Sequence, residues 1–128
     1  MNMRTILFAG IAASLIAAPA FAHHSFAMFD ATKVVTLEGT VKSFEWTNPH
    51  MWLTVSVPQA SGAPIEYPLE MQGIAGAVKL GWKRDSAKAG DKITVNIHPL
   101  RDGTHGGQLL NVVLGNGTKL GVMGGPAN

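Results

Sequence analysis

The sequence predicts a small all-β barrel of five strands, with one short helix between the third and fourth strands. Short runs of β-branched and aromatic residues alternate with Gly and Pro from residue 34 onward, a pattern typical of strands joined by tight turns. One segment, which begins at Gly73, changes to the spacing of a helix. The chain has no cysteine, so packing or a partner must stabilise the fold, and no thiolate can act as a nucleophile or metal ligand.

The first strand is predicted over residues 34–46, with a bend in its middle. Its apolar residues share one face as far as Val41, whereas Phe44 and Trp46 fall on the opposite parity. Because side chains alternate with a period of two, this change needs an extra residue, and we expect a bulge near Lys42 and Ser43.

The second and third strands are predicted to form a hairpin. Asn48-Pro49 favours a turn over residues 47–50, and the hairpin loop spans residues 58–64. Pro68 cannot donate a ladder hydrogen bond, so the third strand should be an edge or be unpaired there. Glu66 and Glu70 are expected to form a solvated outer face. The expected inward residues are Met51, Leu53, Val55, Val57, Ile65, Tyr67, Leu69 and Met71.

The helix is expected to follow Gly73 and to end near Gly81. A fourth strand, a flexible loop over residues 101–107 and a fifth strand over residues 109–114 should come next. Asn116-Gly117 suggests a last tight hairpin to a short strand over residues 120–123. The residues expected on the inner helix face and in the fourth strand are Ile74, Ala77, Val78, Trp82, Ile93, Val95 and Ile97.

This order of elements is that of the oligonucleotide/oligosaccharide-binding (OB) barrel. A bent first strand agrees with it, because the bend lets a small sheet curl. The alternative is an open β-sandwich with a helical crossover.

Residues 1–22 are predicted to be a cleavable secretory signal. Arg4 supplies a positive charge, an apolar run of about 13 residues follows, and small residues precede a cleavage site after Ala22. The alternative, an uncleaved membrane anchor, needs an apolar run of about 20 residues. We expect a periplasmic protein made of one OB-like domain (residues 23–123) with an N-terminal segment (23–33) and a flexible tail (124–128). The medium is the other possible compartment.

The charge balance argues against a nucleic-acid partner. Removing Arg4 with the signal leaves nine Lys and Arg against eight Asp and Glu. Binding of a polyanion needs clustered cations. The one basic cluster contains Asp85 and consists of Lys79, Lys83, Arg84 and Lys88.

Four residues around the first turn are candidates for ligand binding: Trp46, Asn48, His50 and Trp52. OB barrels often place ligand contacts at this turn, and an outward Trp52 can stack on a ring or a partner. The alternatives are structural. Trp52 can lie beneath the N-terminal segment, covered by Phe26 and Phe29, and Asn48 can cap its own backbone as a turn residue.

A copper site is the second functional hypothesis. Cleavage after Ala22 gives His23 a free α-amine beside its imidazole, and nitrogen ligands in tetragonal geometry suit Cu(II). This arrangement resembles the histidine brace of exported copper proteins. The alternative is a solvated, disordered chain end. The metal candidates are His23, His24, His50 and His105, with His98, Met28 and Met51 as further ligands to consider.

Several sequence runs resemble successive signatures of one group of small exported bacterial proteins, a domain of unknown function. They are HHSFA at residues 23–27, VTLEGTV at 35–41, EWTNPH at 45–50, GWKRDS at 81–86 and GDK at 90–92. The resemblance implies export and a single domain, and it carries no activity. In architecture the chain is also similar to periplasmic OB-type barrel proteins. Since no catalytic constellation stands out, we expect a non-enzymatic binding or accessory domain for an unknown small ligand or periplasmic partner protein.

Overall fold

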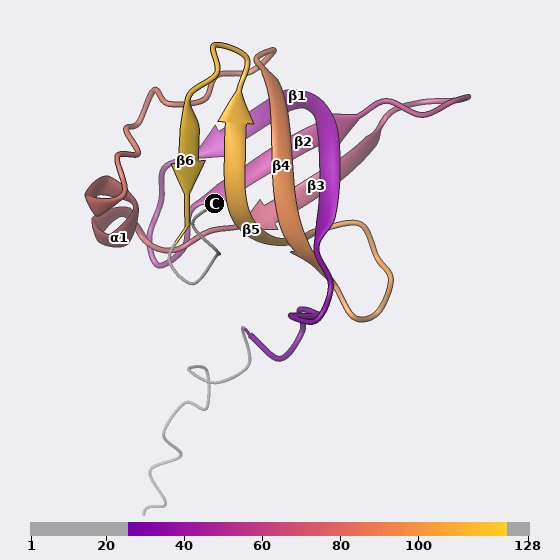
Figure 1. Cartoon of the computed structure of the whole chain (residues 1–128), viewed down its shortest axis with the longest axis horizontal. Coiled ribbons are helices and arrows are strands. Elements are labelled where there is room, and N and C mark those ends of the chain that lie inside the picture. Colours follow the sequence, from indigo (N-terminus) through magenta and orange to yellow (C-terminus); the bar gives the residue numbers. More distant parts are fainter. Residues whose placement is uncertain (1–25, 123–128) are drawn as a thin grey trace, which may run out of the picture.

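The computed structural model describes residues 26–122, and its regular secondary structure consists of strands and one short helix (Figure 1). The expected signal at residues 1–22, His23 and His24, and the expected tail at 124–128 lie outside this range. Within it no helix is long and apolar enough to cross a membrane. The elements in chain order are β1 (Val35–Glu45), β2 (Trp52–Val57), β3 (Ile65–Glu70), α1 (Ile74–Lys79), β4 (Lys92–Pro99), β5 (Gly107–Leu114) and β6 (Lys119–Gly121).

The first five strands close into a barrel. The sheet order is β3-β2-β1-β4-β5-β6, and β3 also pairs with β5 in parallel at Leu69 and Glu70. This is the strand order of the OB barrel, with β6 added at the edge of β5. The predicted fold class is therefore confirmed, and the β3–β5 pairing rules out an open sandwich. Pro68 lies just before this pairing begins, where β3 has only β2 beside it, as predicted.

Strand β1 is shared by both halves of the barrel. It pairs with β4 through residues 35–40 and with β2 through residues 40–45, so the chain arches over the top of the molecule in Figure 1. The register against β2 shifts between Val41 and Ser43, which leaves Lys42 as the extra residue and confirms the predicted bulge. At the crossing point a Cβ on Gly39 would lie 2.2 Å from the backbone oxygen of Ser56, so only glycine permits the close approach.

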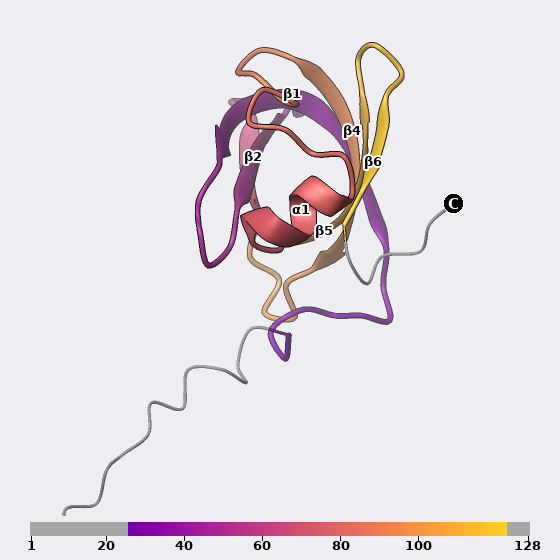
Figure 2. The same cartoon turned by 90° about the vertical axis from the view of Figure 1, so that its left-hand side faces the viewer.

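The core fills the barrel with inward residues of β2, β4 and β5, of which those of β2 and β4 were predicted, and α1 lies across the barrel mouth (Figure 2). Trp82, just after α1, is buried and its Nε1–H donates to the backbone oxygen of Gly121 at 2.8 Å. Val78, expected on the inner helix face, is instead 54% exposed. The six-residue helix makes fewer than two turns, so Ala77 takes the inward position and its neighbour faces solvent.

Candidate functional site

The first loop, residues 46–51, is held in place by hydrogen bonds at four of its residues. The Thr47 hydroxyl donates to the His50 oxygen at 2.9 Å, and the Met51 amide donates to the Gln72 oxygen at 3.2 Å. The Ile74 amide donates to Asn48 Oδ1 at 3.0 Å. The loop is therefore fixed against the segment that joins β3 to α1.

Asn48 caps the first turn of α1 instead of its own backbone, so the expected local cap is wrong. The helix begins after Gly73, which has no side chain to cap with, and Asn48 replaces it from a distant part of the chain. The first loop lies close to the start of α1, since a Cβ on Gly73 would be 2.7 Å from the backbone oxygen of Pro49. The side-chain oxygen of Asn48 therefore accepts a hydrogen bond from within the protein.

The imidazole of His50 and the carboxylate of Glu70 are in contact on the outer side of the barrel. His50 Nδ1 faces Glu70 Oε1, and Glu70 is only 8% exposed. The expectation that Glu66 and Glu70 share a solvated face is therefore wrong for Glu70. The reason is its place at the end of β3, where the first loop on one side and β5 on the other cover the carboxylate.

The pair fixes the direction of the imidazole. A carboxylate at Nδ1 makes that nitrogen the donor and leaves Nε2 as the acceptor of a neutral ring. Within residues 26–122 no hydrogen bond involves His50 Nε2. A histidine held in this way by a carboxylate is the arrangement that orients metal-binding and hydrogen-bonding imidazoles.

The three tryptophans have different environments. Trp82 is buried, and Trp46 packs against the core with its ring 6.0 Å from that of Phe44. Trp52 is half-buried and stands outside the core cluster. Phe26, which was expected to help cover it, is 73% exposed. Of the four predicted ligand-binding residues, His50 and Trp52 thus face outward beside Glu70, whereas Trp46 and Asn48 have structural contacts.

The described histidines do not gather into one metal centre. His105 packs its ring against Tyr67 with centroids 5.1 Å apart, and His98 Nδ1 lies 2.7 Å from the Lys33 oxygen. Within residues 26–122 no three His, Asp or Glu side chains are grouped as metal ligands. Met51 is completely buried and has no access to a loop site.

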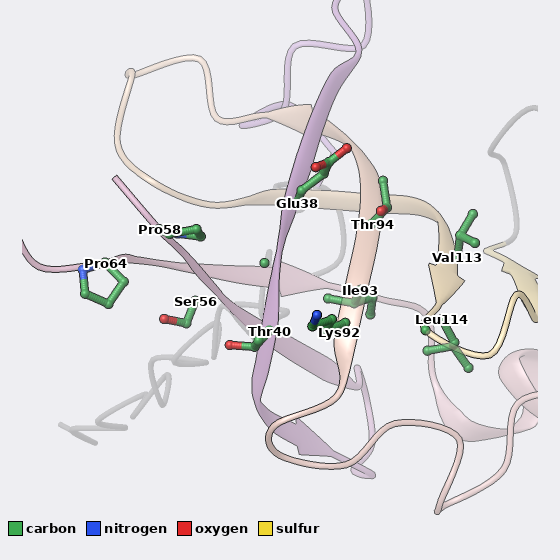
Figure 3. Close-up of a pocket in the computed structure, with 12 residues that line it drawn as sticks. Glu38, Thr40, Ser56, Pro58, Pro64, Lys92, Ile93, Thr94, Val113 and Leu114 are labelled. Atoms are coloured by element: carbon green, nitrogen blue, oxygen red, sulfur yellow. The ribbon is translucent and has the colours of Figure 1, made fainter. Parts of the chain in front are cut away.

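A hollow of about 560 Å³ lies at the opposite ends of β2 and β3 (Figure 3). Pro58 and Pro64 stand on one side of β1, and Ile93 and Thr94 stand on the other. Its lining includes one acid, Glu38, and one base, Lys92, and is otherwise uncharged. Nothing in the sequence pattern marked this hollow, because its residues come from four strands.

Glu70 is the residue that the sequence reasoning missed. The alternating pattern treats Glu66 and Glu70 alike, since both occupy outer positions of β3. The hairpin register offers a signal: if Val57 pairs with Ile65, then Trp52 must pair with Glu70, close to the first loop. Counting back from the hairpin loop would have placed this carboxylate next to His50.

Together these features define a small OB-like barrel with a histidine–carboxylate pair and an outward tryptophan on one face. The chain belongs to the family of unknown function DUF6152, whose model matches residues 12–109. This confirms the resemblance found in the sequence motifs. A search of the curated proteins found no match to the chain, and neither did a search of the solved structures.

Proposed function

We propose that the chain is an exported, non-enzymatic binding domain that acts in the periplasm, and that its ligand or partner occupies the outer face formed by the first loop, β2 and the end of β3. The observation that carries this proposal is the pairing of His50 with the nearly buried Glu70. A carboxylate costs free energy to bury, and this one orients an imidazole on the outside of the barrel.

The position of the pair supports the same proposal. In OB barrels the face of the second and third strands, with the loops that flank it, is the usual place for ligands. Here the first loop lies on the α1 side of the end of β3, and the loop between β4 and β5 lies on the other side (Figure 1).

Photo-crosslinking in cells that export the protein tests this proposal. A benzophenone amino acid at Thr54, the next outer residue of β2 after Trp52, should give a defined adduct by intact-mass analysis. The same group at Thr94, on the outer side of β4 beside the hollow, is the matched control. The Thr54 adduct should disappear when His50→Ala and Trp52→Ala are combined. Equal labelling at both positions, or labelling that survives the double change, contradicts the proposal.

A copper-binding role is the second candidate, because of how the start of the described chain is anchored. The Met28 oxygen accepts from the Arg101 amide at 2.9 Å, and the Ala27 oxygen accepts from Arg101 Nε at 3.1 Å. Arg101 belongs to the loop that carries His105. Ala27 lies four positions after His23, and a segment of this length reaches at most about 14 Å. His105 is therefore the favoured second imidazole for a site built on His23.

Titration of Cu(II) into protein that begins at His23, followed by EPR at one equivalent, tests the copper role. The matched control carries one extra Gly before His23, which moves the α-amine out of chelating range. Tight one-to-one binding that is lost in the control and in His105→Ala supports the site. Equal, weak binding by both proteins rejects it.

A further inference from the structure

The face around Trp52 is a row of three side chains from neighbouring strands. Trp52 of β2 pairs with Glu45 of β1 on one side and with Glu70 of β3 on the other. Directly paired residues project from the same face, with Cβ atoms about 5 Å apart. Leu53, the next residue along β2, is completely buried, so the row lies on the outside of the barrel. The indole therefore stands between two carboxyl groups.

The charge of this row is not neutralised by lysine or arginine. Within residues 26–122 the Lys–carboxylate pairs join Lys33 to Asp30 and Lys42 to Glu66. Glu45 is exposed and takes part in neither pair, and Glu70 has only the imidazole of His50 as a partner. The face thus combines acidic character with a half-exposed indole whose ring is negative on its surface.

We infer that this face binds an extended segment of a partner protein, with a Lys or Arg side chain resting on Trp52 between Glu45 and Glu70. This inference rests on the proposed binding role and names the chemistry of the partner. A cation over an indole is attracted by the ring, and two flanking carboxylates add to that attraction.

The shape of the face favours a peptide over a free amine. Small-molecule sites are concave, and the 560 Å³ hollow lies at the far ends of β2 and β3, away from the row. Extended peptides instead lie along strands and place alternate side chains on the sheet. A segment that lies along β2 passes over Trp52 with Glu45 on one side and Glu70 on the other, so one of its alternate side chains reaches all three residues of the row.

The test uses a short synthetic peptide of alternating Gly and Lys, an acidic counterpart with Glu in place of Lys, and free choline as a small cation. Binding is followed by NMR through the indole Nε1–H signal of Trp52. The Gly-Lys peptide should bind, more weakly as salt rises from low to physiological concentration, and the acidic peptide should not. Choline should bind at least about tenfold more weakly than the Gly-Lys peptide, since it meets only one site of the row.

Glu45→Gln is the decisive variant, because Glu45 is exposed and its replacement leaves the core intact. The dissociation constant of the Gly-Lys peptide should rise about tenfold, the effect of losing one close charge pair beside the ring. Glu38→Gln removes the same charge from another exposed outer position of β1 and should change binding less than about twofold. Trp52→Leu, followed through the backbone amide signals of β2 because the indole is gone, should abolish binding while the fold is retained.

Each outcome has a defined meaning. If Glu38→Gln and Glu45→Gln weaken binding equally, the interaction is general electrostatics and the inference is wrong. If choline binds as tightly as the peptide, a protein partner is the wrong occupant. If no cation binds but the Thr54 crosslink still forms, the proposed function survives and only the cationic chemistry fails. If both are absent, the two fail together.

Discussion

The two ends of the β2–β3 hairpin differ in what they offer a ligand. One end holds the 560 Å³ hollow, lined by apolar side chains, small hydroxyl residues, prolines and a single pair of opposite charges. The other end has a fixed loop, a nearly buried carboxylate, an oriented imidazole and an outward indole. The first end provides space and the second provides directional chemistry. Recognition depends on placed polar and aromatic groups as well as on volume, which is why the proposed site lies at the second end.

The largest expected effect concerns the crossing of β1 over β2 beside the hollow. Gly39→Val places a side chain against the Ser56 backbone, which cannot move away without breaking the barrel. We expect the free energy of unfolding to fall by about 3 kcal/mol or more, measured by urea denaturation. Gly121→Ala is the control, since a Cβ there meets no atom within 4 Å. If both variants unfold at the wild-type urea midpoint, the hollow end is more plastic than the structure indicates.

Removing the carboxylate at the other end should be the next largest effect. Glu70→Ala leaves His50 Nδ1 without its acceptor and removes buried methylene groups, so we expect a loss of about 2 kcal/mol in chemical denaturation. Glu66→Ala is the matched control on the same strand. Glu66 forms a salt bridge with Lys42, and both side chains are exposed to solvent. Glu66→Ala should therefore lower the free energy of unfolding by less than about 1 kcal/mol. Equal losses for the two variants contradict a special role for Glu70.

Asn48→Ala tests whether the first loop depends on the helix that it caps. Loss of the acceptor for the Ile74 amide should cost about 1 kcal/mol, seen as a lower Tm. Asn48→Asp keeps an acceptor oxygen and should remain near the wild-type Tm. If both variants have the same Tm, well below that of wild type, the side-chain NH₂ of Asn48 is what stabilises the fold, and the cap on α1 is not the explanation.

The smallest effect is expected in the N-terminal segment at acidic pH. The Thr32 hydroxyl donates to the Asp30 carboxylate, and with Lys33 beside it this lowers the pKa of Asp30 from 3.8 to about 2. A lowered pKa stabilises the folded state above pH 3.8, and this contribution is lost as the pH falls towards 2. The Lys33 amide donates to the backbone oxygen of Asp30. At neutral pH, Asp30→Asn should therefore increase the rate of hydrogen exchange at this amide. The difference from wild type should vanish near pH 2. A difference that persists there assigns the effect to packing.

The barrel was largely predictable from local patterns. Alternation identified the inward residues of β2 and β4, and the parity change between Val41 and Phe44 located the bulge. These features depend only on the period of a strand, which is written into neighbouring residues. The helix face was less predictable, since a helix of six residues is too short for its period to fix the position of Val78.

The candidate site was predictable only in part. His50 and Trp52 stood out by residue type and by their place near a turn. Asn48 and Trp46 looked equally suited, yet one caps α1 and the other packs on Phe44. The Asn48 contact joins residues 26 positions apart in the chain, and residue type does not reveal it. The Trp46 contact follows from the parity that this residue shares with Phe44.

By itself the sequence determined the strand-rich architecture, the bulge, the hairpin turns and the membership of a family that carries no known activity. Only the tertiary structure decided that Glu70 is buried against His50 and that Glu45 of β1 flanks Trp52 on its other side. The physical reason is that periodicity fixes which face of a strand a residue occupies. What lies opposite on that face depends on strand register and barrel closure, and these are set by the fold as a whole.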